Sequence, residues 1–258
     1  MADSAPQPSL AQLLRDRKAA GEKLAVLTAY DYPTARLLDE AGVDLLLVGD
    51  SLGMVVLGLP DTTGVTMSMM LHHATAVRRA AKNATVIVDL PAQSYGMPDQ
   101  ALHNAKRLVA AGADAVKLEG GVDVVDQVRA ITDAGIAYVG HLGMLPQSVK
   151  REGGYKKKGK TEIDADRLLK DALALEEAGA AAIVLESIVA EVAGKISKAL
   201  KIPTIGIGAG PDCDGQVLVT PDLLGAFPWF KPPFATALAN VAEDTTRAVK
   251  EWVAGVKS

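Results

Sequence analysis

The stretch Val43-Asp44-Leu45-Leu46-Leu47-Val48-Gly49-Asp50-Ser51 decides the fold, because a short apolar run stops there at a glycine, an aspartate and a serine. A uniformly apolar strand is buried on both faces, as the strands of parallel sheets are. The polar residues therefore mark the carboxyl end of a strand, where α/β folds gather their functional groups. We expect four acidic strand ends on one rim, because the same pattern returns in Val86-Ile87-Val88-Asp89, Val116-Lys117-Leu118-Glu119 and Ile183-Val184-Leu185-Glu186.

A repeating unit surrounds these strands. Ala41-Gly42-Val43-Asp44, Ala111-Gly112-Ala113-Asp114 and Ala178-Gly179-Ala180-Ala181 each end a helix with glycine before a buried strand, as successive right-handed βα units do. Eight such units favour an α/β fold of the closed (β/α)8 (TIM) barrel type. An open doubly wound sheet stays possible, although that fold usually has a Gly-rich turn after its first strand. The strands are expected at Leu24–Ala29, Leu45–Val48, Thr85–Asp89, Ala115–Leu118, Ala137–Gly140, Ala182–Leu185, Thr204–Ile207 and Gln216–Val219.

The whole chain, residues 1–258, is predicted to form this single barrel domain, because no linker or abrupt change in composition divides it. A short amphipathic helix is expected at about 9–20, with Ser9 as its cap. A second helix, at about 235–253, is expected to close the chain.

The composition is that of an ordinary globular protein: 49% of the 258 residues are hydrophobic and 22% are charged. A net charge of -4 and a pI near 5.6 give no basic surface for nucleic acid or anionic membrane, so a small-molecule ligand is the default. No apolar run is long enough to span a bilayer, and Met1 to Pro8 lacks the features of a signal peptide, so a cytoplasmic location is expected. One cysteine, Cys213, excludes an internal disulfide and a multi-Cys zinc site.

Two connections are longer than a barrel requires. Leu52 to Thr66 and Leu142 to Thr161 both follow strand carboxyl ends, so one or both are candidate lids over the rim. The second contains Lys156-Lys157-Lys158, for which a solvated loop is the favoured interpretation over an anion-steering role.

The four acidic strand ends are the candidate functional groups. Each has an ordinary alternative, since Asp and Glu are common in the first turn of a helix, and Lys117 with Glu119 on the same strand face could be a structural ion pair. Four carboxylates on one rim, however, repel one another unless cations or protons neutralise them. Oxygen ligands without a His/Cys cluster favour Mg²⁺ over Zn²⁺, and Mn²⁺ would fit the same set. The predicted cation site comprises Asp50, Asp89, Glu119 and Glu186.

Other candidates carry weaker signals. Ser51 could donate to a substrate carboxylate or simply start a turn. His141 ends the fifth predicted strand and could face the same cavity, whereas the other histidines fall in predicted helices. Gly206-Ile207-Gly208-Ala209-Gly210 could bind a phosphate, or it could be a turn that needs positive φ.

Taken together, six motifs resemble the ketopantoate hydroxymethyltransferase family. The resemblance extends from about Leu24 to Gly225, in order and without a large gap. The motifs are Thr28-Ala29-Tyr30-Asp31-Tyr32-Pro33-Thr34-Ala35, Val48-Gly49-Asp50-Ser51-Leu52-Gly53-Met54-Val55, Val88-Asp89-Leu90-Pro91, Val116-Lys117-Leu118-Glu119-Gly120-Gly121, Gly140-His141-Leu142-Gly143-Met144-Leu145-Pro146-Gln147-Ser148, and Gly206-Ile207-Gly208-Ala209-Gly210 with Asp214-Gly215-Gln216.

This resemblance implies a barrel of the phosphoenolpyruvate/pyruvate type that transfers a hydroxymethyl group from 5,10-methylenetetrahydrofolate to 3-methyl-2-oxobutanoate, on the route to pantothenate, through a metal-stabilised enolate. It implies Mg²⁺ on Asp50 and Asp89 with Glu119 on or near it, and Glu186 as the general base. Asp50, Ser51, Asp89 and Lys117 would contact the 2-oxo acid. Family members are commonly cytoplasmic homo-oligomers, decamers of two pentameric rings.

The chain departs from the family pattern mainly after the eighth strand, at Val219 to Gly225 and at Lys231-Pro232-Pro233-Phe234. These departures concern the edge of the folate pocket and the subunit contacts rather than the predicted metal site. Alternatives are a metal-dependent C–C lyase of the isocitrate lyase/phosphoenolpyruvate mutase type, a Schiff-base aldolase using Lys117, and a non-catalytic barrel that binds a small acid. A carboxylate beside Lys117 argues against the Schiff base, because it keeps the amine protonated.

Overall fold

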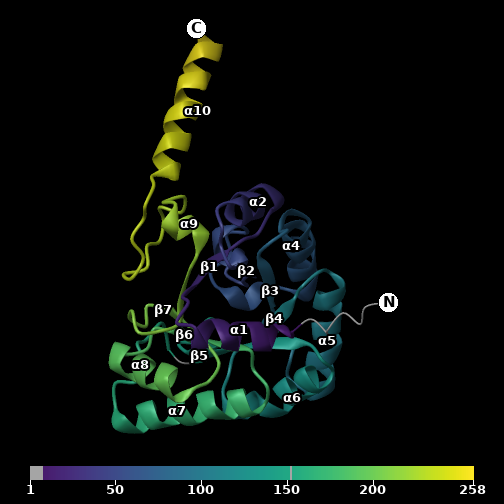
Figure 1. Cartoon of the computed structure of the whole chain (residues 1–258). Coiled ribbons are helices and arrows are strands. Elements are labelled where there is room, and N and C mark those ends of the chain that lie inside the picture. Colours follow the sequence, from purple (N-terminus) through teal and green to yellow (C-terminus); the bar gives the residue numbers. More distant parts are fainter. Residues whose placement is uncertain (1–7, 152) are drawn as a thin grey trace. The chain divides into compact units, whose positions relative to one another are not determined.

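The computed structural model describes residues 8–151 and 153–258. Eight parallel strands follow one another in chain order and close into a barrel, with helices outside it (Figure 1). The (β/α)8 prediction is therefore confirmed and the open sheet is excluded. The strands are β1 (Leu24–Thr28), β2 (Leu45–Val48), β3 (Thr85–Asp89), β4 (Ala115–Lys117), β5 (Ala137–Gly143), β6 (Ala182–Glu186), β7 (Thr204–Ile207) and β8 (Gly215–Leu218).

Several helices begin where the sequence supplies an N-cap residue. Asp31, Thr66 and Thr161 each accept a hydrogen bond from a backbone N–H in the first turn of the helix that follows. The helices are α1 (Leu10–Ala19), α2 (Tyr32–Glu40), α3 (Leu52–Val55), α4 (Met67–Ala80), α5 (Pro98–Ala110), α6 (Val125–Asp133), α7 (Glu162–Glu177), α8 (Ala190–Ala199), α9 (Thr220–Leu223) and α10 (Val241–Lys257), with 3-10 turns η1 (Thr62–Gly64), η2 (Val122–Val124) and η3 (Pro146–Ser148).

Side chains alternate along each strand, and this alternation divides the core in two. One set packs between the strands and the surrounding helices, for example Leu46, Val88 and Leu185. The other set fills the barrel interior, for example Leu47 and Val139. Residues that continue the second set at the carboxyl ends of the strands consequently point into the barrel mouth.

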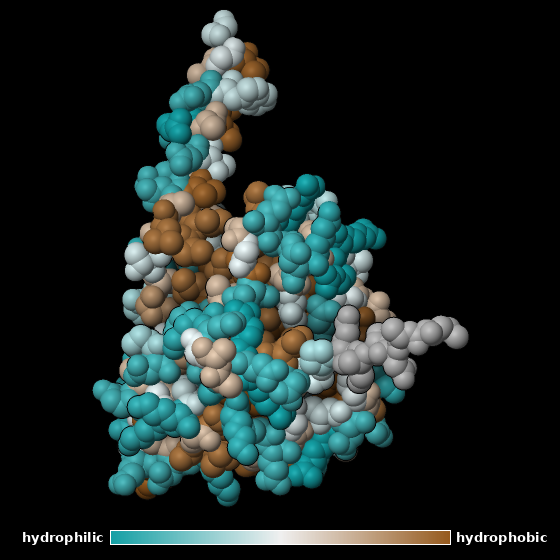
Figure 2. Space-filling view, viewed as in Figure 1, coloured by the Kyte–Doolittle hydropathy of each residue, from teal (hydrophilic) through white to brown (hydrophobic). Residues whose placement is uncertain are grey.

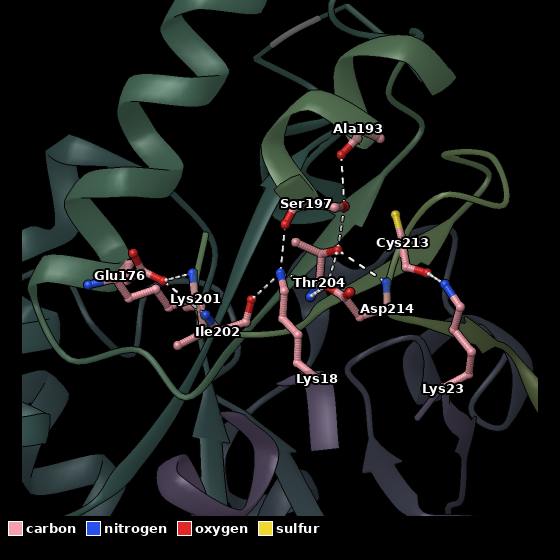
Figure 3. A network of polar contacts seen from close by, with 10 residues as sticks. All are labelled: Lys18, Lys23, Glu176, Ala193, Ser197, Lys201, Ile202, Thr204, Cys213 and Asp214. Atoms are coloured by element: carbon pink, nitrogen blue, oxygen red, sulfur yellow. Dashed lines mark hydrogen bonds and ion pairs between the residues drawn. The ribbon is translucent and has the colours of Figure 1, made fainter. Parts of the chain in front are cut away.

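Helix α1 closes the opposite end of the barrel. Its Leu14 belongs to the interior cluster, and Ser9 caps it by accepting from the N–H of Gln12, as predicted. Lys18 on the same helix donates to the carbonyl oxygens of Ser197 and Ile202, at 2.6 and 2.9 Å, and its Nζ lies 3.0 Å from Asp214 Oδ2 (Figure 3). These contacts join α1 to the segments that lead into β7 and β8.

The chain folds into two compact units, Met1–Val217 and Leu218–Ser258. The first holds the barrel except for Leu218, the last residue of β8. The second holds α9 and α10, and Figure 2 shows apolar side chains gathered on the stretch that leads into α10, where Trp229 and Leu238 are exposed. Within residues 8–151 and 153–258, no helix has the length and apolarity needed to cross a membrane.

The strand predictions hold to within one residue at each end, except that β5 runs three residues further than expected, to Gly143. The predicted bounds of the terminal helix, 235–253, were wrong: α10 begins at Val241 and ends at Lys257. The residues between Phe234 and α10 hydrogen-bond elsewhere: the Leu238 N–H donates to the Leu223 carbonyl oxygen at 2.8 Å, and the Val241 N–H donates to that of Leu224 at 3.1 Å. Asn240 precedes the first helical residue.

Candidate functional site

The barrel mouth gathers the polar side chains that the sequence pattern indicates. Four polar residues continue the inward-facing rows of their strands: Asp89 on β3, Lys117 on β4, His141 on β5 and Glu186 on β6. Glu119 lies two residues beyond Lys117, so its side chain points to the same side as that of Lys117. Asp89, Lys117, Glu119 and His141 are all buried, and the Glu186 side chain retains 13% of its accessible surface. The expected rim of acidic strand ends is therefore present and enclosed.

Asp50 and Ser51 reach the mouth from the end of β2. The Asp50 N–H donates to Asp89 Oδ2 at 3.0 Å, so the ends of β2 and β3 lie side by side. A Cβ on Gly49 would lie only 3.0 Å from Ser51 Oγ and 3.6 Å from Asp89 Oδ2, and glycine at this position leaves the two polar groups room. Ser51 Oγ shares a hydrogen bond of 2.8 Å with the hydroxyl of buried Tyr30.

Lys117 forms an ion pair with Asp89 rather than with Glu119, its neighbour in the sequence. Its Nζ lies 2.8 Å from Asp89 Oδ1 on the adjacent strand, and the ion pair with Glu119 that the strand parity suggested does not form. Burial alone would lower the pKa of Lys117, but the negative charges of Asp89, Asp50 and Glu119 outweigh it and raise that pKa. The ammonium therefore stays charged inside the mouth.

His141 is buried between two glutamates. Its Nε2 lies 3.1 Å from Glu186 Oε2, and its Nδ1 lies 3.7 Å from Glu119 Oε1 and 3.4 Å from Lys117 Nζ. Burial, reinforced by the charge of Lys117, lowers the pKa of His141 well below its ordinary value. The imidazole is therefore neutral near pH 7, and its contacts with the glutamates are not ion pairs.

Three carboxyl groups of the mouth, those of Asp50, Glu119 and Glu186, have raised pKa values. Burial, with repulsion from Asp89 next, raises the pKa of Asp50 to about 7. Burial likewise raises the pKa of Glu186 to about 8 and that of Glu119 well above its usual range. Four carboxylates face one ammonium here, so a net charge of -3 would remain if all were ionised, and a bound cation is the simplest way to lower these pKa values.

Gln147 is a central residue that sequence reasoning did not single out, although it lies in one of the six motifs. It comes from η3, and its Nε2 donates to Asp50 Oδ2 at 2.7 Å and to the Leu90 carbonyl oxygen at 3.0 Å. Its backbone N–H donates to Glu119 Oε2 at 3.1 Å, and its Oε1 accepts from the Tyr95 hydroxyl. A glutamine on a loop carries no periodic signal, so only its position after His141-Leu142-Gly143 could have indicated it.

Gly143 at the end of β5 allows this loop to pass close to β6. Its φ is +100°, and a Cβ there would lie 2.1 Å from the Glu186 carbonyl oxygen, which itself accepts from the Met144 N–H at 2.8 Å. Only glycine combines a positive φ with the absence of a Cβ atom. Gly143 therefore lets the loop that carries Gln147 run beside the strand end that carries Glu186.

The mouth fits a hard divalent cation with few protein ligands. Across residues 8–151 and 153–258, no three His, Cys, Asp or Glu side chains are already arranged around a common metal position. Asp89 Oδ1 is nevertheless buried without a hydrogen bond, and the Lys117 ammonium lies 2.8 Å from it. Asp50 lies beside it, and two carboxylates with water and substrate completing the shell are how proteins usually hold Mg²⁺. Asp50 and Asp89 are therefore the residues that could hold such a cation.

Comparison with known proteins places this arrangement in a family. The model of the ketopantoate hydroxymethyltransferase family matches residues 9–258, including the stretch after Val219 where the chain departs from the usual motifs. The chain belongs to the ketopantoate hydroxymethyltransferase family. It is 55% identical to 3-methyl-2-oxobutanoate hydroxymethyltransferase of Ignicoccus hospitalis, over 92% of this chain and 90% of that protein. It is 53% identical to the enzyme of the same name from Acetivibrio thermocellus, over 94% of this chain and 87% of the other.

Several solved structures have a fold similar to that of this chain. A phosphonopyruvate hydrolase crystallised with oxalate and Mg²⁺ has a TM-score of 0.65 at 16% identity, covering 97% of this chain and 87% of that one. The 2,3-dimethylmalate lyase, a member of the PEP mutase/isocitrate lyase superfamily, has a TM-score of 0.63 at 20% identity, covering 98% and 88%. At these identities the likeness concerns the fold, so the family shares its barrel type with that superfamily.

Proposed function

We propose that this protein transfers a hydroxymethyl group from 5,10-methylenetetrahydrofolate to 3-methyl-2-oxobutanoate, giving 2-dehydropantoate in pantothenate biosynthesis. The observation that carries the proposal is Glu186, a buried carboxyl with a pKa raised to about 8, held 3.1 Å from a neutral histidine in the mouth of the barrel. Membership of the family and the names of its relatives supply the substrates.

Asp50 and Asp89 would hold the Mg²⁺ ion, with Glu119 on or near it. When bound, the ion would supply electrostatic stabilisation of negative charge on the oxygen atoms of a 2-oxo acid. Gln147 would fix the Asp50 side chain through its 2.7 Å hydrogen bond, and its backbone N–H orients Glu119. The protein groups thus set which carboxylate oxygens remain available to the cation.

Glu186 would remove the proton from C3 of the acid. A carboxylate with an ordinary pKa near 4.5 is a poor base for a carbon-bound proton, and a pKa of about 8 makes it much stronger near neutral pH. Neutral His141 lies beside the glutamate without a hydrogen bond from its Nε2, and because it carries no charge it leaves the basicity of Glu186 intact.

Lys117 and Ser51 would also bind the 2-oxo acid. Lys117 keeps its charge, so it would offset the negative charge that develops when C3 loses its proton. Ser51, oriented by Tyr30, has a hydroxyl that would hydrogen-bond the carboxylate of the acid. The charged state and the Asp89 contact of Lys117 also weigh against Schiff-base chemistry, which needs a neutral amine.

Proton exchange at C3 tests this assignment without the folate donor. We expect the protein with Mg²⁺ to exchange the C3 proton of 3-methyl-2-oxobutanoate with deuterium oxide, followed by NMR. Glu186→Gln should lower exchange and turnover by about a hundredfold or more while still binding the acid. Exchange that persists in Glu186→Gln would remove this residue as the base, and a wild-type protein without Mg²⁺-dependent exchange would contradict the proposed reaction.

The family also suggests a cytoplasmic homo-oligomer, a decamer by resemblance, and this stays a prediction. One feature supports self-association: none of the α10 residues is buried, and Val249, Trp252 and Val256 share an exposed apolar face of that helix. Sedimentation equilibrium of the whole chain would measure the assembly, and a monomer at all concentrations would contradict it.

A further inference from the structure

A hollow of about 610 Å³ opens beside the catalytic mouth. Residues that follow β3, β4 and β5 line it, together with one face of α7. Its volume is in the range of cavities that bind small molecules. The 2-oxo acid proposed above is anchored at the mouth itself, so the hollow is available for a second and larger ligand.

The hollow shares walls with the mouth. Glu119 and Gln147 line it, and Gln147 also donates to Asp50. Gly143 lines it too, and in the barrel Gly143 pairs with Glu186 on the adjacent strand. A ligand in the hollow would therefore end next to the groups that we assign to activation of C3.

The far wall presents a carboxylate with an available oxygen. Asp171 Oδ1 accepts from the Val122 N–H at 3.0 Å, and within the described residues no hydrogen bond or ion pair engages Oδ2. A Cβ on Gly121 would lie 2.2 Å from the Asp171 Cγ, so glycine at 121 lets this carboxylate reach the wall of the hollow. Asp171 is half-buried there. The other charged residues on the lining are Glu119, Asp123, Arg151, Lys158 and Arg167.

The donor of the proposed reaction has a matching edge. A reduced pterin carries an exocyclic amino group beside a ring N–H, two donors that point the same way, and a carboxylate is the acceptor that receives such a pair. The nitrogen atoms that bear the one-carbon unit lie toward the opposite side of the ring system. A pterin with its amino edge on Asp171 would thus turn its one-carbon unit toward Glu119 and Gln147.

We propose that this hollow binds the reduced pterin of the one-carbon donor, with Asp171 as the acceptor for its amino edge. The proposal rests on the transfer reaction proposed above. Asp171 binds the cosubstrate and takes no part in activation of the 2-oxo acid, so the two proposals can be tested separately.

The substitution Asp171→Asn tests the site with little change in shape. Asparagine keeps an oxygen to accept from the Val122 N–H, but it replaces the second oxygen by an NH₂ group that cannot receive the pterin. Asp166→Asn makes the same change on the same helix at an exposed position that does not line the hollow, and it serves as the matched control. Both variants keep every group that we assign to C3 activation.

Binding is measured by calorimetric titration with 5-formyltetrahydrofolate, which carries the reduced pterin but does not transfer its one-carbon unit. We expect Asp171→Asn to bind it about tenfold to a hundredfold more weakly than the wild type, as loss of a charge-assisted hydrogen bond predicts, and its KM for 5,10-methylenetetrahydrofolate to rise similarly. Mg²⁺-dependent exchange of the C3 proton should stay at the wild-type rate in both variants. Binding by Asp171→Asn within about twofold of Asp166→Asn would overturn the pterin site, whereas loss of exchange in the wild type would overturn the reaction instead.

Discussion

At the scale of single residues, the ionisation of Glu186 sets the expected pH dependence. A base must be deprotonated to act, and burial raises the pKa of Glu186 to about 8. With saturating Mg²⁺, we expect the rate of C3 proton exchange to rise with pH, with a midpoint at or below about 8, because a nearby cation lowers the pKa of a carboxyl group. The Glu186→Gln variant should show no such rise. Exchange that falls between pH 6 and pH 8 would contradict this role.

The residues of the mouth differ in how far sequence could predict them. Asp89, Glu119 and Glu186 follow the inward-facing residues of their strands at even spacing, so strand alternation predicts the face that each occupies. Asp50 does not follow from this rule, because Leu47 faces inward and Asp50 lies three residues further on, beyond the end of β2. The partner of Lys117 was not predictable in this way, because Asp89 lies on a different strand and the pairing depends on the register between β3 and β4, where Asp89 stands opposite Lys117. Such cross-strand contacts exist only once the barrel has closed.

At the scale of elements, the contacts of α1 are expected to support the barrel without affecting its chemistry. Lys18 makes two hydrogen bonds to carbonyl oxygens and an ion pair with Asp214, all at the end remote from the mouth. Lys18→Met should lower the free energy of unfolding by about 2–3 kcal/mol, because buried acceptors lose a charged donor. Urea denaturation measures this loss, and kcat should not change.

The control is Lys23→Met, which removes one hydrogen bond, of 2.7 Å to the Cys213 carbonyl oxygen, from an exposed lysine at the same end (Figure 3). It should cost about 1 kcal/mol or less. Equal losses in the two variants would show that the network around Lys18 adds nothing beyond a single surface contact.

Element boundaries followed from sequence where local chemistry determines them. Ser9 before α1 and Gly42 after α2 marked helix ends correctly. The start of α10 was misplaced, because alanine-rich residues after Pro233 have high helix propensity, yet the backbone turns before it enters the helix at Val241. Propensity predicts which residues tolerate a helix, and not where a chain leaves the preceding loop.

At the scale of the whole molecule, the crowded carboxylates predict how cation and pH together control stability. Asp50, Glu119 and Glu186 have raised pKa values in the folded protein, so between about pH 4.5 and pH 8 the folded chain holds protons that the unfolded chain has released. Stability of the cation-free protein should therefore fall as the pH rises through that interval, since stability rises with pH only where the unfolded state binds more protons.

Mg²⁺ should reverse this loss, because it binds the ionised carboxylates of the folded protein and finds no such group of ligands in the unfolded chain. At a hundred times its Kd, the ion should add about 2.7 kcal/mol to the free energy of unfolding. The gain at a fixed Mg²⁺ concentration should be larger at pH 8 than at pH 6, because protons compete with the ion at the lower pH. Thermal unfolding of EDTA-treated protein with and without Mg²⁺ measures both effects, with Asp89→Asn as the variant that should lose most of the gain. A gain of equal size at both pH values, or one that Asp89→Asn retains, would show that the ion binds elsewhere than at this rim.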